Sequence, residues 1–241
     1  MADVEMAKPA APVKRSDLPV RLASAVIMLA VAIAALIVGG RLFDSVVLLV
    51  ALVAFVEFVL LVIKATANIP FRFAAIIVGA LYFAAAGGVL AGAGDFLIVL
   101  ILGVTIFTDT FAYFTGRTIG GPKVAPAISP KKTWAGLIGG MIGAALWLVL
   151  WVVAIDGGIV GPRFELGLAL NGDNLGTAAL IGAGLALLAQ AGDFFESWLK
   201  RRAGVKDSSK LIPGHGGVFD RIDGMVPVAI AVGALGWILA G

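Results

Sequence analysis

The sequence predicts an all-α, polytopic integral membrane protein with about seven transmembrane helices. Of its 241 residues, 61% are hydrophobic and only 14% are charged, and the mean hydropathy is +1.06. Soluble domains are roughly 45–50% apolar and about 25% charged, so this chain carries too little charge to cover a soluble core with polar surface. Apolar runs of about 20 residues, the length that spans a bilayer as a helix, also recur along the chain.

Seven apolar segments are the candidate transmembrane helices. They are residues 20–39, 42–63, 71–92, 96–116, 133–155, 177–199 and 225–240. Residues 1–16 are polar and rich in alanine and proline, and we expect them to form a disordered cytoplasmic arm. Residues 17–241 are then expected to form a single transmembrane domain. The 32 glycines fit a bundle whose helices pack closely in lipid.

The basic residues are distributed unevenly across the predicted membrane. All 18 lysines and arginines except Arg41 and Arg163 fall in segments that alternate on one side of the seven spans. Because cytoplasmic loops are enriched in Lys and Arg, this side is predicted to be cytoplasmic, together with the N-terminus. The pI near 9.3 therefore reflects topology, and we expect no nucleic-acid partner. The absence of cysteine excludes disulfides, Cys-ligated metals and thiol nucleophiles.

Four carboxylates fall inside the predicted spans, where an ionised side chain costs at least ~2.5–3.5 kcal/mol at the bilayer centre. Glu57 is open between a structural hydrogen bond and a peripheral role. Asp109 is open between a site residue and a bond between helices. Asp193 and Glu196 share one polar stripe of their helix, and two such carboxylates repel each other unless a basic side chain or a cation lies between them.

A polar segment, "KDSSKLIPGHGGVFDRIDG" at residues 206–224, interrupts the apolar sequence. Its aspartates supply the oxygen ligands that Mg²⁺ prefers, and its basic residues suit phosphate groups. The glycines around His215 would let backbone N–H groups approach an anion. His215 itself is open between a turn residue and a phosphate partner. Together these features indicate phosphoryl or nucleotidyl transfer, although no P-loop spacing is present.

The polar segment also carries a family resemblance. Residues 197–223, "SWLKRRAGVKDSSKLIPGHGGVFDRID", resemble the signature of the phosphatidate cytidylyltransferases, also called CDP-diacylglycerol synthases. The upstream stretches "QAGDFFES", "DTFAYFTGR" and "ISPKKTWAG" are similar to further motifs of that family. The resemblance covers residues 109–136 and 190–224. One departure is Ala135, where the family usually has Glu, so the role of that acid is in doubt in this chain.

The resemblance implies an enzyme that converts CTP and phosphatidic acid to CDP-diacylglycerol and pyrophosphate in phospholipid biosynthesis. It implies a multi-pass protein of a bacterial-type inner membrane, with cytoplasmic active-site segments at about 117–133 and 200–224 within a catalytic domain of residues 17–241. The implied cofactor is Mg²⁺, and a second cation, Mg²⁺ or K⁺, would suit the acidic site. The implied partners are CTP, phosphatidic acid and the lipid bilayer, and a homodimer is left open.

The candidate residues fall into three groups. The catalytic group is Asp193, Asp220, Lys200, Arg201, Lys206, His215 and Arg221. The substrate-binding group is Ser129, Lys131, Lys132, Thr133, Ser197, Asp207, Ser209, Gly216 and Gly217. The metal group is Asp193 and Asp220 as the main ligands, with Asp223, Asp109 and Glu196 as further ligands.

Two other functions fit part of the pattern. A transporter could use the intramembrane acids as an ion or proton pathway, but the acids and basic loops gather at one face and no inverted repeat is visible. A lipid kinase would use similar phosphate chemistry and release a nucleoside diphosphate. Release of pyrophosphate from CTP in the presence of phosphatidic acid separates the three functions.

Overall fold

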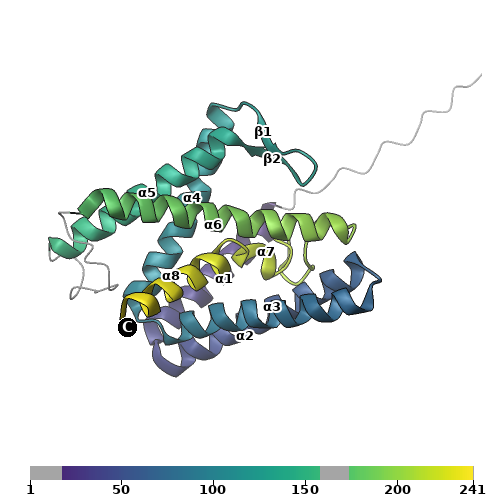
Figure 1. Cartoon of the computed structure of the whole chain (residues 1–241). Helices are drawn as coiled ribbons and strands as arrows, with labels where there is room; N and C mark the ends of the chain where they lie inside the picture. The colour runs from purple at the N-terminus through teal and green to yellow at the C-terminus, as the bar shows by residue number, and fades with distance from the viewer. Residues whose placement is uncertain (1–17, 158–173, 241) are drawn as a thin grey trace, which may run out of the picture.

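The computed structural model describes residues 18–157 and 174–240, which form a bundle of long helices (Figure 1). The helices are α1 Leu18–Val38, α2 Gly40–Ala65, α3 Ile69–Gly92, α4 Asp95–Thr118, α5 Trp134–Asp156, α6 Leu175–Arg202, α7 Phe219–Ile222 and α8 Met225–Ala240. Each of the seven apolar segments that the sequence predicts as a transmembrane helix is helical in the structure. The predicted disordered arm lies outside the described residues.

The described residues contain six helices that are long and apolar enough to cross a membrane, α1 to α6. The predicted seventh span, α8, is helical but has only 16 residues. At about 1.5 Å per residue it is roughly 24 Å long, less than the ~30 Å hydrocarbon core of a bilayer. In Figure 1, α8 runs beside only one part of α6, and α7 with the polar segment lies beside the rest. The polar segment therefore occupies the length that a full seventh span would have used.

The close approach of α4 to α5 depends on glycines. A Cβ atom at Gly136, Gly140 or Gly143 of α5 would lie 2.6–3.1 Å from backbone carbonyl oxygens of α4. No side chain fits at that distance, so glycine lets the two backbones pack directly, as is common between helices in lipid. Gln190 of α6 adds a hydrogen bond from its Nε2 to the carbonyl of Leu137 in α5, at 3.1 Å. These contacts hold the functional parts of α4 and α6 on either side of α5.

The short helix α7 is held in the bundle by an aromatic cluster. Phe219 is buried, with its ring centroid 5.2 Å from that of Phe83 in α3 and 6.2 Å from that of Phe58 in α2. Such aromatic pairs stabilise a fold beyond the area that they bury. The polar residues next to Phe219 are thereby fixed against α2 and α3.

A two-stranded antiparallel hairpin follows α4 and is an addition to the expected all-α fold. Strand β1, Lys123–Ala125, pairs with β2, Ser129–Thr133, so that Lys123 lies opposite Thr133. The buried hydroxyl of Thr133 accepts a hydrogen bond from the backbone N–H of Gly136 and caps the start of α5. Lys131 and Lys132 in β2 are thus presented at the end of a fixed helix.

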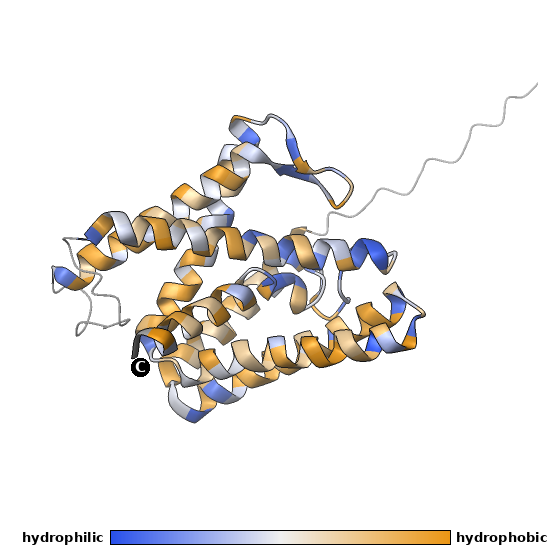
Figure 2. Ribbon diagram, in the orientation of Figure 1, coloured by the Kyte–Doolittle hydropathy of each residue, from blue (hydrophilic) through white to orange (hydrophobic). Residues whose placement is uncertain are grey.

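The surface of the bundle is largely apolar. Figure 2 shows hydrophobic residues along the outer faces of the long helices, whereas hydrophilic residues gather at helix ends, on the hairpin and around α7. Large apolar side chains such as Leu52, Ile77 and Leu180 are exposed on this surface. Apolar surface of this extent is unfavourable in water and is expected to face lipid. The chain is therefore an integral membrane protein, as the sequence predicts.

Candidate functional site

A polar cavity of about 680 Å³ opens among α4, β2, α5, α6 and the polar segment. It collects most of the residues that the sequence predicts as a site. Those that line it are Asp109, Lys131, Lys132, Thr133, Asp193, Glu196, Ser197, Lys200, Arg201, Lys206, Asp207, Asp220, Arg221 and Asp223. Residues of α4, the hairpin, α6 and the polar segment therefore converge in one place.

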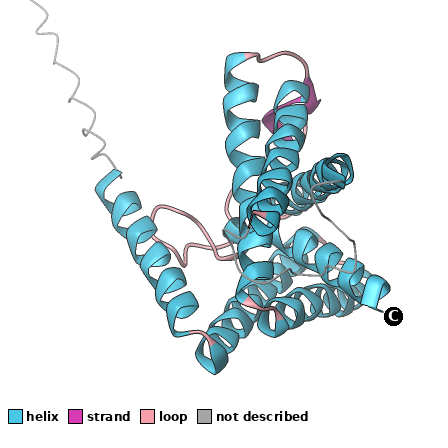
Figure 3. Ribbon diagram, turned by 90° about the vertical axis from the view of Figure 1, so that its left-hand side faces the viewer, coloured by secondary structure: helices cyan, strands magenta, loops and turns pink. Residues whose placement is uncertain are grey.

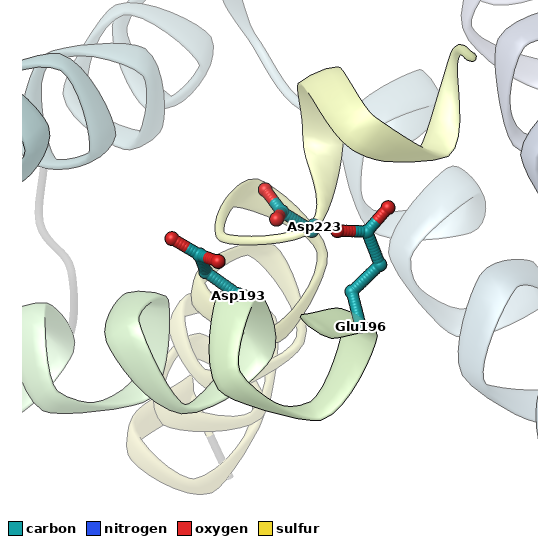
Figure 4. Close-up of side chains that lie close together, drawn as sticks. All are labelled: Asp193, Glu196 and Asp223. Carbon is teal, nitrogen blue, oxygen red and sulfur yellow. The ribbon is translucent and has the colours of Figure 1, made fainter. Parts of the chain in front are cut away.

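Three carboxylates form a tight group in this cavity. Asp193 and Glu196 of α6 and Asp223 before α8 each offer an oxygen, and these oxygens all lie within 4.8 Å of one another. Figure 4 shows the three side chains converging from the two elements. Glu196 is 1% exposed, and its Oε1 has no hydrogen-bond partner among the described residues. Three hard oxygen donors, one of them buried and unpartnered, fit a Mg²⁺ ion.

Two lysines lie against these carboxylates. Lys200 Nζ lies 2.5 Å from Glu196 Oε2 and 2.6 Å from Asp220 Oδ1, so it joins α6 to α7. Lys132 of the hairpin lies 2.5 Å from Asp193 Oδ2. The two acids of α6, Asp193 and Glu196, repel each other unless positive charge lies near them. Lys132 and Lys200 supply part of that charge.

Asp220 is held differently from the three clustered acids. Its Oδ2 accepts hydrogen bonds from the backbone N–H groups of Ser208 and Gly217, both at 2.8 Å. Burial opposes its charged form, but the interactions with Glu196 and Lys200 and these two N–H groups outweigh burial and lower the pKa of Asp220 to about 2. Asp220 is therefore an anion whose two oxygens both have protein partners, and its predicted pairing with Asp193 on one metal ion stays a prediction.

The pKa of Asp223 is shifted in the opposite direction to that of Asp220. Burial raises its pKa to about 7, and the negative charge of Asp193 acts in the same direction. The backbone N–H of Gly224 lies 2.8 Å from its Oδ1 and favours the charged form. A cation bound among the three carboxylates would favour that form further.

Glu57 anchors the polar segment to α2. The sequence leaves Glu57 open between a structural hydrogen bond and a peripheral role, and its contacts are those of a structural hydrogen-bond acceptor. It is 4% exposed. Its Oε1 accepts from Ser209 Oγ at 2.6 Å and from the backbone N–H of Val218 at 3.1 Å. Its Oε2 accepts from Phe219 N–H at 2.8 Å and lies 2.9 Å from Ser208 Oγ. Ser209, predicted to bind substrate, is thus engaged with Glu57.

His215 lies away from the carboxylates, in a second cavity of about 500 Å³. Its Nδ1 is 2.8 Å from Ser24 Oγ of α1, and the same hydroxyl lies 2.8 Å from the carbonyl of Pro213. The turn closes through hydrogen bonds between Ile212 and Gly216. His215 is therefore a turn residue bound to α1 that also lines a cavity, and its role as a phosphate partner stays a prediction.

Other predicted residues are placed as follows. Gly216 and Ser209 line the second cavity, whereas Gly217 and Ser129 line neither. A Cβ atom at Gly217 would collide with Ser208 and Glu57, so glycine is required there for packing. Ala135 does not line the first cavity, although its neighbour Gly136 does.

Several cavity residues have no place among the sequence-based candidates. Tyr113 and Arg117 of α4 line the first cavity, with Arg117 Nη1 2.6 Å from the Tyr113 hydroxyl. Both belong to the quoted stretch "DTFAYFTGR", which was the available signal. Arg21 of α1 lines the second cavity, and Ser24 of α1 contacts the lining residue His215. Both lie in the apolar N-terminal part of the sequence, where no motif marks them.

Comparisons with known proteins show the family of the chain. The family model described as the cytidylyltransferase family matches residues 73–239. Phosphatidate cytidylyltransferase of Brucella melitensis is 43% identical over 143 residues, which cover 59% of this chain and 47% of that protein. Those of Haemophilus influenzae and Thermotoga maritima are 39% and 40% identical, over 55% and 54% of this chain and 42% and 45% of those proteins. The chain spans about half the length of these curated relatives.

Proposed function

Because the chain belongs to the cytidylyltransferase family, we propose that it transfers the cytidylyl group of CTP to phosphatidic acid. An oxygen of the lipid phosphate attacks the α-phosphorus of CTP, the bond from that phosphorus to the bridging oxygen of the β-phosphate breaks, and pyrophosphate leaves. The products are CDP-diacylglycerol and pyrophosphate. The observation that supports this best is the single cavity in which Asp193, Glu196 and Asp223 meet Lys132 and Lys200.

The charge pattern of the cavity suits a reaction between two phosphate-bearing substrates. The lipid phosphate is already an anion, so the step needs no strong general base. The main barrier is the repulsion between two polyanions, which cationic side chains and positioning reduce. Lys131, Arg201, Lys206 and Arg221 line the cavity beside the two lysines and provide that charge.

We further propose that Mg²⁺ binds at the carboxylate cluster. Asp193, Glu196 and Asp223 would hold it, with Asp109 and Asp220 in the same cavity as further ligands. When bound, Mg²⁺ neutralises charge on the nucleotide phosphates. A second cation, Mg²⁺ or K⁺, remains part of the proposal because six carboxylates share this cavity.

The proposed location is a bacterial inner membrane, with the active site on the cytoplasmic side. The bacterial origin of the relatives supports the first part, and the distribution of lysine and arginine supports the second. CTP would then enter from the cytoplasm, whereas the lipid would enter from the bilayer. A homodimer stays open, as it does from the sequence alone.

The decisive experiment is turnover by the purified protein. The protein in mixed micelles receives radiolabelled CTP, dioleoyl phosphatidic acid and Mg²⁺, and the lipid and phosphate products are separated. We expect equal amounts of CDP-diacylglycerol and pyrophosphate. Release of CDP with a phosphorylated lipid would identify a lipid kinase, and no turnover by a well-folded sample would reject the proposal.

A matched pair of variants makes this experiment specific. Asp193→Asn removes a carboxylate of the cluster, whereas Asp95→Asn removes one at the start of α4, outside the cavities described above. The first variant should lose activity and the second should keep it. Equal loss in both would mean that the cavity is not the reaction site.

A further inference from the structure

The second cavity has a composition that differs from that of the first. Four basic residues line it, Arg21, Lys206, Lys210 and Arg221, together with the single carboxylate of Asp207. The metal-binding cluster is not part of it. Such a lining is suited to a phosphate group that carries no metal ion.

The two cavities share a wall. Lys206, Asp207 and Arg221 line both of them. A phosphate group in the second cavity and a nucleotide in the first cavity would therefore meet across the two cationic side chains of Lys206 and Arg221. A reaction that joins two phosphate groups requires this kind of arrangement, because both must approach one place from different sides.

Helix α1 forms the outer wall of the basic cavity. Gly214 has a φ of +76°, and a Cβ atom there would lie 2.6 Å from Cγ of Arg21. Only glycine combines this backbone conformation with so close an approach. Together with the contact between Ser24 and His215, it fixes Arg21 over the turn. In Figure 3, α1 stands at the side of the bundle, with this loop beside it.

An apolar cavity of about 170 Å³ lies farther along α1. Its lining comes from Ala32, Ala35 and Leu36 of α1 and from the facing helices α2, α3, α4 and α8, and every lining residue is apolar. Ile222, the neighbour of Arg221, also lines it. Helix α1 therefore borders a basic cavity near one end and an apolar cavity farther along.

We propose that the basic and apolar cavities together bind the acceptor lipid, with its phosphate beside Arg21 and an acyl chain along Ala32. Helix α1 is then the wall past which the lipid enters from the bilayer. This inference rests on the proposed function, because it assigns the place of one of the two substrates. The class of ligand is a phosphate monoester that carries long acyl chains.

The dimensions of α1 agree with such a ligand. From Arg21 to Ala32 the helix rises by roughly 16 Å at 1.5 Å per residue. Half of the hydrocarbon core of a bilayer is about 15 Å thick. A lipid of one leaflet with its phosphate at Arg21 therefore reaches Ala32 with its chains. A nucleotide has no group that would occupy the apolar cavity, so CTP belongs to the carboxylate cavity.

The first test separates the head group from the chains. Arg21→Gln should raise the KM for phosphatidic acid about 10-fold, because a charge-assisted hydrogen bond is lost, and leave the KM for CTP unchanged. Ala32→Phe should raise the KM for dioleoyl phosphatidic acid but not for the dihexanoyl form, whose chains are too short to reach it. The matched controls are Arg41→Gln and Ala34→Phe. Neither Arg41 nor Ala34 lines any of the three cavities.

The outcomes separate this inference from the proposed function. If the wild-type protein makes CDP-diacylglycerol but Arg21→Gln raises the KM for CTP instead, the basic cavity belongs to the nucleotide and the inference is wrong. If Ala32→Phe affects both lipids equally, or neither, the acyl assignment is wrong.

A binding measurement covers the case in which no turnover is found. Immobilised protein in detergent, without CTP, should retain radiolabelled dioleoyl phosphatidic acid in preference to phosphatidylcholine. Arg21→Gln should lose that preference, and Arg21→Lys should restore part of it. Retention that is equal in the wild-type protein and Arg21→Gln would overturn the inference whether or not the enzyme is active.

Discussion

Glu57 Oε2 lies 2.9 Å from Ser208 Oγ, although 151 residues separate them in sequence. The same hydroxyl lies 2.8 Å from Asp220 Oδ2, and since it has one proton it donates to only one of them at a time. Asp220 in turn binds Lys200, which binds Glu196. A buried acid of α2 is thereby linked through three residues to the carboxylate cluster.

Glu57→Gln should weaken this link. The amide nitrogen of glutamine is a donor and would face N–H and O–H groups that are also donors. Hydrogen bonds to charged groups stabilise by about 1.5–3 kcal/mol, so we expect a lower melting temperature in detergent and a reduced kcat. Asp44→Asn, on the same helix and outside the three cavities, is the control. Wild-type melting and turnover in Glu57→Gln would remove Glu57 from the support of the site.

Loss of Asp193, a cluster carboxylate, or of Asp220, which Lys200 joins to the cluster, should reduce catalysis strongly. Asp193→Asn and Asp220→Asn are each expected to lower kcat by about 10²-fold or more, as losing a main electrostatic stabiliser does. If both act on one ion, the double variant is little worse than either single variant. Effects that multiply would show independent roles, which would fit the separate hydrogen bonding of Asp220.

Asp223→Asn tests the cluster that the structure brings together. If Mg²⁺ binds among the three carboxylates, the variant needs a higher Mg²⁺ concentration for half-maximal activity. Titration of activity with Mg²⁺ measures this, with Asp95→Asn as the matched control. An unchanged Mg²⁺ dependence would place the ion away from Asp223.

Ala135→Glu restores the residue that the family usually has. The position lies in the first turn of α5, next to the cavity-lining Gly136. If an acid there assists a cation, the Mg²⁺ dependence of activity should shift relative to the wild-type protein, whereas Ala135→Gln should not shift it. An unchanged dependence at an unchanged rate would exclude the position from the site.

The orientation of the chain is also testable. A reporter fused before Ala2 is expected to be cytoplasmic, and one fused after Gly241 to lie on the opposite side, because of the biased distribution of lysine and arginine. Accessibility of each fusion to a membrane-impermeant reagent measures this. Reporters on the same side would mean that α8 does not cross the bilayer, which its 16 residues make the weakest of the expected spans.

The long apolar runs and the convergence of the motifs could be predicted from the sequence, because a helix in lipid needs only local hydrophobicity and its carboxylates need partners. The partners of Glu57 could not, since they lie in a loop whose path depends on tertiary packing around Phe219. Arg21 carries no local signal, and its position follows from the approach of α1 to Gly214. The bounds of α8 agree with the predicted segment 225–240, but an apolar run has no mark for the depth at which it begins, so the crossing of the bilayer by this 16-residue helix stays a prediction.

The shortness of α8, roughly 24 Å against a hydrocarbon core of ~30 Å, has an energetic consequence for the candidate site. Where a full helix would exclude solvent, the polar segment beside α6 leaves a recess that water can fill. Asp193 and Glu196 lie in the last third of α6 and face this recess, so they need not bear the cost of at least ~2.5–3.5 kcal/mol that each charge would carry at the bilayer centre. If the chain acts as proposed, this recess is a hydrated chamber in which ionic chemistry would reach a lipid that stays in its leaflet.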